Sequence, residues 1–364
     1  MAKFATIFTS FTSVHLTKDV GMIPMEVSQC AGFSKSLIIY RGEGVNNPYK
    51  DNLTLIPIKA INKYIYFLKV FYFIVRNNVS HINLYHLSVE TFFFITIIKA
   101  LTNKKIYLKL DMSSEWLDAL KTHAECSKKK WFIKKKIISM VDLSSVETKV
   151  VHSRLKDIWP NERLIIVPNA ISMLTIPSIS NPLKYKDRDR AIIVVGRIGA
   201  YPKNHEMIID ALKNQRLKNG WKIKFIGPIN DDFKYKIDEI KEHPDVESIE
   251  FLGNIDRKSL VDLYRKSRFF LMTSHHEGFS LAMMEAAYFG NVIISTPVSG
   301  VDDITKGGEY GVIISHDNVL ELNNIINSII SDDSSFEQQY EARLNYIYSN
   351  FDLKVKVEEI INEI

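Results

Sequence analysis

The segment Glu277-Gly278-Phe279-Ser280-Leu281-Ala282-Met283-Met284-Glu285 decides the fold of the second half of this chain. It predicts a tight turn that leads directly into a helix, with a carboxylate at each end. Gly278 lacks a Cβ, so it would permit a positive φ and a close approach of a ligand to the backbone. The helix N-terminus would then present unpaired N–H groups from about Ser280 to Met283, which is a ready site for a phosphate.

Two carboxylates beside an anion site require a ligand that carries hydroxyls as well as phosphate. Carboxylates accept hydrogen bonds from ribose and hexose hydroxyls, whereas backbone amides hold a diphosphate. A nucleotide-sugar meets both requirements. Glu285 could instead be a solvated helical residue. Its neighbours are apolar, however, so we expect this helix to be mostly buried, and a buried carboxylate without a partner is costly. The burial therefore favours a ligand-binding role for Glu285.

Cations follow an earlier strand of the same half. Gly196-Arg197 comes directly after the expected strand 191–195, and Lys203 lies further along the same loop. Arg can engage two phosphate oxygens, and Lys acts as a mobile point charge, so this strand end could neutralise a diphosphate. For either cation alone, the alternative is a charged surface residue in a loop.

Short apolar runs alternate with helical patterns along the whole chain, which predicts parallel sheets covered by helices on both faces. We therefore expect an α/β fold with two doubly wound, Rossmann-like domains. The expected strands are 4–8, 36–39, 53–57, 81–85, 105–110, 143–146, 164–167, 191–195, 222–226, 248–252, 269–272, 292–295 and 311–314. The expected helices are 22–31, 61–76, 89–101, 128–141, 148–159, 205–217, 231–243, 257–267, 281–289, 318–330 and 336–348.

Composition places the domain boundary between residues 173 and 190, a Pro/Ser/Asn/Lys-rich stretch without helical or strand periodicity. We expect an N-terminal domain over residues 1–180, which binds the acceptor, and a C-terminal domain over 181–350, which binds the donor. Residues 351–364 should form an amphipathic helix that packs back towards the N-terminal domain.

Three features of the second half follow its strands in a fixed order. They are Gly196-Arg197 with Lys203, the Glu277–Glu285 segment, and Thr296-Pro297-Val298-Ser299-Gly300. Together they resemble the donor-binding domain of the retaining glycosyltransferases of family 4, which have the GT-B fold. The resemblance covers about residues 192–314. It implies a hexosyltransferase with two domains facing a cleft, a nucleotide-diphosphate sugar as donor, and retention by a front-face route.

The resemblance also implies roles for single residues. Arg197 and Lys203 would stabilise the leaving diphosphate in place of a metal, so no cofactor and no metal are expected. Glu277 would contact the donor hexose near its reacting face, and Glu285 would bind the ribose hydroxyls. The remaining donor-binding residues are expected to act mainly through their backbone: Gly196, Gly278, Phe279, Ser280 and Leu281.

The first half matches the family less closely. Gly21 lies between the expected first strand and first helix, where family members place a glycine loop near the phosphates. The strand 105–110 is followed by Asp111, where the family often has a His, so Asp111 is a candidate active-site residue or a turn Asp that caps a helix. His15 could instead line the cleft. Pro168-Asn169-Ala170 resembles the Pro-Asn-Gly that ends the first domain in the family.

Two charged stretches carry alternatives. Asp187-Arg188-Asp189 matches a metal-binding motif of another transferase fold, but it precedes a strand and we interpret it as solvated charge. Lys128–Lys136 has an aromatic-apolar centre between lysines, which suits either an interfacial membrane contact or a solvated helix with a buried stripe. Tyr64, Phe67 and Tyr72 could join that surface or fill the core. The net charge of +5 and the spacing of the aromatics do not favour nucleic acid.

We therefore expect a cytoplasmic enzyme, peripheral at the inner face of the membrane. It would move a hexose or N-acetylhexosamine to a saccharide or lipid-linked acceptor in surface polysaccharide or glycoconjugate biosynthesis. Two cysteines in 364 residues form no disulfide framework, which favours a reducing compartment. Two other classes stay open: an inert GT-B subunit that supports another transferase, and a nucleotide-sugar epimerase of similar fold.

Overall fold

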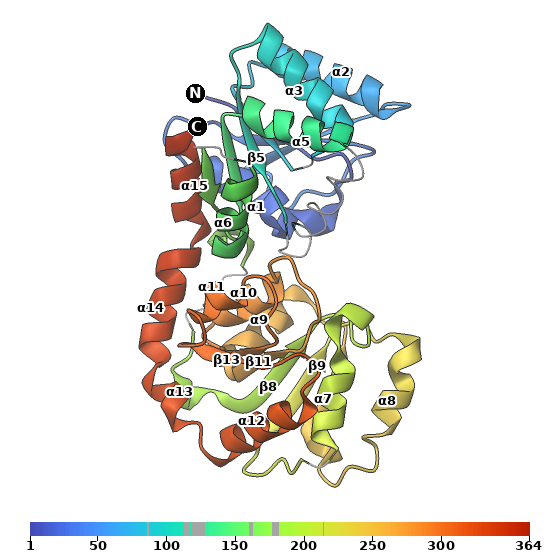
Figure 1. The fold of residues 1–364 in the computed structure, drawn as a ribbon, viewed down its shortest axis with the longest axis vertical. Coiled ribbons are helices and arrows are strands. Elements are labelled where there is room, and N and C mark those ends of the chain that lie inside the picture. Colours follow the sequence, from blue (N-terminus) through green and yellow to red (C-terminus); the bar gives the residue numbers. More distant parts are fainter. Residues whose placement is uncertain (86, 113–116, 118–127, 160–162, 177–181, 214) are drawn as a thin grey trace. The chain divides into compact units, whose positions relative to one another are not determined.

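The computed structural model describes residues 1–364 except 86, 113–116, 118–127, 160–162, 177–181 and 214. The chain forms two units, each with its own parallel sheet (Figure 1). Unit 1 comprises Met1–Thr175 and Asp352–Ile364, and unit 2 comprises Ile176–Phe351. The chain thus leaves unit 1 within the Pro- and Ser-rich stretch and returns to it at the C-terminal segment.

Unit 1 has a seven-stranded parallel sheet in the order β3-β2-β1-β4-β5-β6-β7. Its strands are β1 Phe4–Ile7, β2 Ser36–Arg41, β3 Leu53–Ile58, β4 His81–Leu84, β5 Lys105–Lys109, β6 Leu143–Val146 and β7 Leu164–Ile166. Its α-helices are α1 Asp19–Val27, α2 Lys63–Arg76, α3 Val89–Leu101, α5 Lys128–Met140, α6 Lys149–Ile158 and α15 Leu353–Glu363. A short 3-10 helix, η1 Ser13–Thr17, precedes α1.

Unit 2 has a six-stranded parallel sheet in the order β10-β9-β8-β11-β12-β13. Its strands are β8 Asp189–Val195, β9 Lys222–Ile226, β10 Ile249–Gly253, β11 Ser267–Met272, β12 Val292–Ser295 and β13 Gly311–Ile313. Its α-helices are α7 His205–Leu212, α8 Lys234–Asp238, α9 Arg257–Lys266, α10 Leu281–Tyr288, α11 Val301–Thr305, α12 Val319–Ser331, α13 Ser334–Gln338 and α14 Tyr340–Phe351.

The two sheets share one topology. In each sheet the strand order reverses beside the first strand of the unit, between β1 and β4 and between β8 and β11. In doubly wound sheets, ligands bind outside the carboxyl ends of the strands at this switch point. The expectation of two doubly wound domains is confirmed, and the topology selects one edge of each sheet as the place to look for a site.

Each sheet is covered on both faces, and the core of each unit lies between sheet and helices. In unit 2, α9, α10 and α11 lie on one side of the sheet, and α7 and α12 lie on the other (Figure 1). The middle of the central strands is buried; Phe269, Phe270 and Leu271 of β11 each have no exposed surface. A continuous apolar run of this kind suits a strand that is buried on both faces.

Several helices differ from the sequence prediction; the expected helix 205–217, for example, ends at Leu212. The expected helix 231–243 is reduced to a 3-10 turn and α8, which buries none of its residues, so tertiary packing gives it little support. The expected helix 336–348 is divided into α13 and α14. The first helix begins at Asp19 instead of residue 22, which places Gly21 inside α1 and not in a loop.

The C-terminal helix belongs to unit 1. Leu353 N donates a hydrogen bond to Ile171 O at 3.1 Å, and α15 packs against α1. Leu353, Val357 and Ile360 bury their side chains in this contact face. The apolar positions of the amphipathic pattern therefore cover α1.

Candidate functional site

The loop after β8 is held in place by the loop after β9. Gly196 N donates to Ile226 O at 3.0 Å, and Ile198 N donates to Pro228 O at 2.8 Å. Gly227 has a φ of +132°, and a Cβ there would lie 1.8 Å from the carbonyl oxygen of Gly196. Only glycine fits such a contact, so the carboxyl ends of β8 and β9 form one close-packed platform.

Lys203 and Glu277 meet at the switch point of unit 2. Lys203 ends a 3-10 turn in the loop after β8, and Glu277 lies in the loop after β11. The Lys203 ammonium forms an ion pair with Glu277, and Ser274 Oγ donates to Glu277 Oε1 at 2.9 Å. The side chains of Lys203 and Glu277 are 23% and 15% exposed. The pair is therefore half-shielded, yet open enough for a ligand to reach it.

Backbone contacts fix these two loops against each other. The hydroxyl of Thr273 donates to the carbonyls of Lys203 and Asn204 at 3.1 and 2.8 Å. The amide of His275 donates to Pro202 O at 2.9 Å. The Lys203–Glu277 distance thus follows from backbone geometry as well as from attraction between the charges.

His205 stiffens the loop that carries Arg197 and Lys203. Its ring nitrogen Nδ1 accepts a hydrogen bond from Gly199 N at 3.1 Å. His205 is buried, and burial, followed by the nearby charge of Lys203, lowers the pKa of His205 to about 3. A neutral imidazole is needed for this acceptor role, so the low pKa and the hydrogen bond support each other.

Arg197 is an exposed residue at the same sheet edge as Lys203. Within the part of the chain that the structure describes, no carboxylate lies within ion-pair distance of Arg197. Gly196 lies beside the Lys203 side chain, since a Cβ on Gly196 would sit 3.6 Å from Lys203 Cε. The edge therefore presents one paired and one unpaired cation, as a binding site for a diphosphate requires.

The N-terminus of α10 has the expected position and a more specific capping than the sequence suggested. Ser280 is the N-cap, and its hydroxyl accepts a hydrogen bond from Met283 N at 3.4 Å. The amides of Leu281 and Ala282 have no partner within the helix, as at any helix N-terminus. Gly278 is absent from the glycines with positive φ, so that expectation is wrong. The turn is formed without a left-handed residue at this position.

The side chain of Phe279 is part of the core. It is 6% exposed, and its ring lies 6.1 Å from the ring of Phe351. It also packs over Gly300, whose φ is +86° and where a Cβ would lie 2.7 Å from the Phe279 ring. The loop after β12 and the turn before α10 are thus locked together, and only the backbone of Phe279 remains for a ligand.

Glu285 has a protein partner that the sequence analysis did not identify. Arg257, the first residue of α9, donates to Glu285 Oε2 at 2.8 Å, and a second nitrogen lies 2.7 Å from Oε1. Such bidentate pairs are strong and orient the carboxylate. Glu285 is buried as expected, but the premise that it lacks a partner is wrong. Tyr264 packs nearby, and burial, with the charge of Glu285, raises the pKa of its hydroxyl.

The candidate residues of the first half lie in unit 1, which the structure describes by itself. Gly21 is buried in α1, and a Cβ there would lie 2.5 Å from Leu16 O. The packing of α1 against the preceding 3-10 helix is thus a sufficient reason for this glycine. Asp111 is exposed just beyond β5. His15 stacks on Phe8 at 5.0 Å, and burial lowers its pKa.

A buried charge cluster lies at the carboxyl edge of the unit 1 sheet. Lys109 has no exposed surface, and its ammonium lies 3.0 Å from Glu147, 3.4 Å from Asp19 and 3.2 Å from the Asn169 amide oxygen. Burial would lower the pKa of Lys109, but the carboxylates outweigh it and raise it. Burial raises the pKa of Glu147 to about 7. Lys109, which directly follows the apolar residues of β5, was the sequence signal for this cluster.

The structure also describes the two other charged stretches that the sequence analysis interpreted. Asp187 and Asp189 are exposed, but Arg188 is buried and donates to Ser267 O at 3.0 Å and to Tyr340 OH at 2.9 Å, so it is not solvated charge. In α5, Lys135 and Lys136 are exposed while Ile137 and Ile138 are buried. The side chains of residues 128–131 lie outside the described part. Among the described helices, none is long and apolar enough to span a membrane.

The comparisons with known proteins agree with this geometry. Residues 176–347 match the family described as glycosyl transferases group 1. Over 161 residues the chain is 23% identical to a glycogen synthase of Mycobacterium tuberculosis, covering 44% of this chain and 39% of the relative. It is 28% identical over 144 residues to the amylovoran biosynthesis glycosyltransferase AmsD of Erwinia amylovora, covering 39% of this chain and 40% of the relative.

Among solved structures, HepE of Anabaena in complex with UDP superimposes with a TM-score of 0.71 at 13% identity, covering 100% of this chain and 99% of that one. At this identity the likeness shows the fold alone. The chain thus has the GT-B fold, and residues 176–347 are similar to the glycosyl transferases group 1. It spans about two fifths of the length of the curated relatives that it matches.

Proposed function

We propose that this chain is a metal-independent, retaining glycosyltransferase that uses a nucleotide-diphosphate sugar. The observation that carries the proposal is the Lys203–Glu277 pair at the switch point of unit 2, beside exposed Arg197 and the N-terminus of α10. These groups match a ligand that has both phosphates and sugar hydroxyls. The alignment with HepE, a structure in complex with UDP, supports uridine diphosphate sugars as the first donors to test.

The pairing suggests how the donor binds. With no diphosphate in place, the ammonium of Lys203 is neutralised by Glu277. A diphosphate would compete for Lys203, and Glu277 would then accept hydrogen bonds from hexose hydroxyls. Arg197 would take a second group of phosphate oxygens, and Glu285, oriented by Arg257, would hold the ribose. Donor binding would thus replace the Lys203–Glu277 ion pair with contacts to the phosphate end and the sugar end of the ligand.

In the reaction, the bond between the anomeric carbon and the diphosphate oxygen breaks, and the acceptor oxygen bonds to the same face of that carbon. The leaving phosphate oxygen takes the proton of the acceptor hydroxyl. Arg197 and Lys203 stabilise the negative charge that develops on the diphosphate. Preorganised charges of this kind are usually the largest catalytic term, and each is worth about 10²–10³ in rate.

We further propose a hexose or N-acetylhexosamine as the transferred group, in surface polysaccharide or glycoconjugate synthesis, as the name of the amylovoran relative suggests. The protein would act in the cytoplasm at the inner membrane face. Exposed Phe132, Lys135 and Lys136 on α5 support the membrane contact. Each lysine near anionic lipid would contribute about 1 kcal/mol. Flotation with anionic vesicles, compared between the wild type and K135E/K136E, tests this contact.

A thermal-shift screen with a panel of nucleotide-sugars tests the donor assignment. A ligand at a hundred times its Kd stabilises the protein by about 2.7 kcal/mol, so the true donor should raise the Tm clearly. Lys203→Ala should remove the shift. Donor hydrolysis by the purified chain would separate an enzyme from an inert partner subunit. Conversion of the sugar to its epimer without any acceptor would contradict the transferase and identify an epimerase.

A further inference from the structure

Helix α2 of unit 1 is apolar on two faces. Tyr66, Val70 and Ile74 point into the core and have no exposed surface. On the other face, Tyr64 is 60% exposed and Leu68 is 59% exposed. An apolar helix face normally packs against another element, but within the part of unit 1 that the structure describes these outer side chains of α2 remain exposed.

Helix α3 continues this surface. Phe93 is 51% exposed, and an open groove of about 330 Å³ runs between α2 and α3. Only one lining residue, Glu90, carries a charge. The lining residues are Tyr64, Phe67, Leu68, Phe71, Glu90, Phe93, Phe94 and Ile97. A groove of this size and polarity suits a hydrocarbon chain better than a saccharide.

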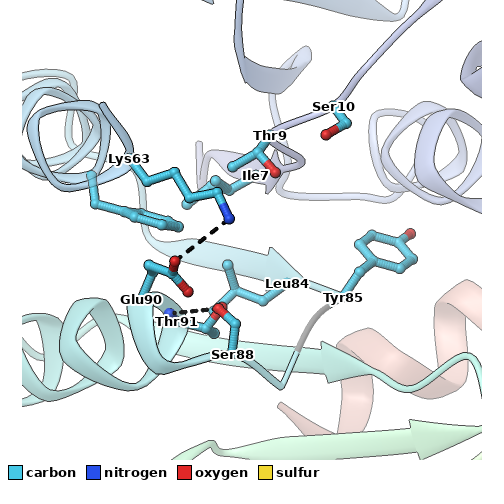
Figure 2. Close-up of a pocket in the computed structure, with 10 residues that line it drawn as sticks. Ile7, Thr9, Ser10, Lys63, Leu84, Tyr85, Ser88, Glu90 and Thr91 are labelled. Carbon is cyan, nitrogen blue, oxygen red and sulfur yellow. Dashed lines mark hydrogen bonds and ion pairs between the residues drawn. The ribbon is translucent and has the colours of Figure 1, made fainter. Parts of the chain in front are cut away.

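A polar pocket of about 270 Å³ adjoins the groove and shares Phe67 and Glu90 with it. It lies at the carboxyl ends of β1 and β4, the switch point of unit 1. Figure 2 shows the Lys63 side chain reaching across this pocket towards Glu90, at an ion-pair distance of 3.5 Å. The rest of its lining combines hydroxyl-bearing side chains (Thr9, Ser10, Tyr85, Ser88 and Thr91) with apolar ones (Ile7, Phe67 and Leu84).

The basic and acidic residues of the helices α2, α3 and α5 are unbalanced, although the two charged residues that line the pockets, Lys63 and Glu90, pair with each other. Helix α2 carries three basic residues, α3 carries one and α5 carries six, whereas Glu90 is the single acidic residue of the three helices. These helices gather on one side of unit 1 (Figure 1). Such an excess of positive charge attracts an anionic ligand. The expected ligand therefore has a hydrocarbon chain, a hydroxylated head and a phosphate.

We propose that the polar pocket and the apolar groove form one acceptor site for a lipid-linked sugar phosphate. The head binds among the hydroxyls at the β1/β4 edge, Lys63 contacts the phosphate, and the first part of the lipid chain lies between α2 and α3. The inference rests on the proposed function, since it selects the lipid-linked class of acceptor. In this proposal the groove holds the lipid chain of the acceptor itself. The experiment below distinguishes this from two other results, in which the surface contacts a bilayer or the site binds a soluble saccharide.

The experiment uses calorimetry to measure binding of farnesyl diphosphate, inorganic diphosphate and farnesol to the full chain saturated with UDP, so that the diphosphate site proposed in unit 2 is already occupied. The wild type should bind farnesyl diphosphate at least tenfold more tightly than either of the other two. Leu68→Asn and Phe93→Asn should each weaken farnesyl diphosphate about tenfold and leave inorganic diphosphate unchanged. Lys63→Gln should weaken both phosphates. The substituted positions are exposed, so these variants should fold.

Leu320→Asn on α12 is the matched control, since Leu320 is an equally exposed apolar residue of unit 2 (71%). Equal affinity for farnesyl diphosphate in Leu68→Asn, Phe93→Asn and the wild type would overturn the proposal. So would a loss of binding to phosphatidylglycerol vesicles with unchanged farnesyl diphosphate affinity, because the surface would then be a bilayer contact. UDP binding, measured in parallel, reports on unit 2, so failure of the donor assignment is seen separately.

Discussion

The two units share one strand order over their first six strands but have opposite treatments of charge at the carboxyl edge of the sheet. In unit 2, Lys203 and Glu277 lie at a half-exposed edge, with Arg197 exposed beside them. In unit 1, the ammonium of Lys109 is wholly buried against Glu147 and Asp19. The topology therefore places charges at this edge in both units, and burial decides whether they are available to a ligand or committed to the fold.

This contrast is consistent with a division of labour. A pair that remains partly exposed can be reached by a competing phosphate, which would take the place of Glu277 beside Lys203. A buried pair cannot be opened without leaving a charge in the core, which costs several kcal/mol. We infer that unit 2 exchanges its ion pair during turnover, while unit 1 keeps its pair and binds ligands through hydroxyls and apolar surface.

The largest expected effect is on catalysis. Lys203→Ala and Glu277→Ala should each lower kcat/KM for donor transfer by about 10³ or more, because one removes the charge that stabilises the leaving group and the other the hexose contact. Initial rates with the donor found in the thermal screen measure this. Lys222→Ala, which breaks an exposed pair with Glu250, is the control and should transfer normally. Near-normal turnover in either site variant would refute the assignment.

The second effect is on stability and tests the comparison directly. Lys109→Met should destabilise the protein by about 3–5 kcal/mol, because Glu147 is left as an unpaired buried acid. Lys203→Met should cost less, because Glu277 is partly exposed and keeps its hydrogen bond from Ser274. Urea unfolding of both variants gives the two free energies. If the two changes in unfolding free energy prove equal, the difference in burial between the two ion pairs does not affect stability.

The third expected effect separates donor binding from acceptor binding. Glu285→Ala should raise KM for the donor about tenfold with little change for the acceptor, because it removes the ribose contact held by Arg257. Asp111→Ala in unit 1 should leave donor affinity unchanged. Titration of UDP against both variants measures this. Equal loss of UDP affinity in the two variants would contradict the assignment of the donor to unit 2.

The smallest expected effect is on the pH dependence of the free energy of unfolding, to which His205 and Glu147 contribute slopes of opposite sign. The pKa of His205 is lowered to about 3, so unfolding takes up a proton and stability rises with pH between about 3 and 6.5. The pKa of Glu147 is raised to about 7, so stability falls as pH rises between 4.5 and 7. Each slope is at most about 1.4 kcal/mol per pH unit.

Urea unfolding from pH 4 to 8 should show these slopes as differences between variants. His205→Gln should lose the rise relative to the wild type, and Glu147→Gln should lose the fall. A variant that keeps the wild-type pH profile would show that its residue does not titrate as the burial indicates.

Much of the fold could be predicted from the sequence because apolar runs report burial directly. All the expected strands are present, and β6, β9 and β12 have the expected bounds. The helices that differ, such as α8, lack a buried stripe, so local pattern could not settle their length. Glycine positions were harder: Gly278 needs no positive φ, whereas Gly227 does, and only its contact with Gly196 shows why.

The candidate site could be predicted as a set of residues but not as a set of contacts. Lys203 and Glu277 were expected at one site, yet their direct pairing joins residues 74 positions apart. The partner of Glu285, Arg257, lies 28 positions away on another helix, and no spacing rule connects them. Pairings of this kind depend on which strand ends the topology brings together, and a linear pattern does not contain that information.

The return of the chain to unit 1 has a consequence for synthesis. Helix α15, which covers α1, is made only after the whole of unit 2. During translation, unit 2 can therefore complete its core while α1 still exposes the face that Val357 and Ile360 later cover. The first domain to begin is therefore the last to be completed.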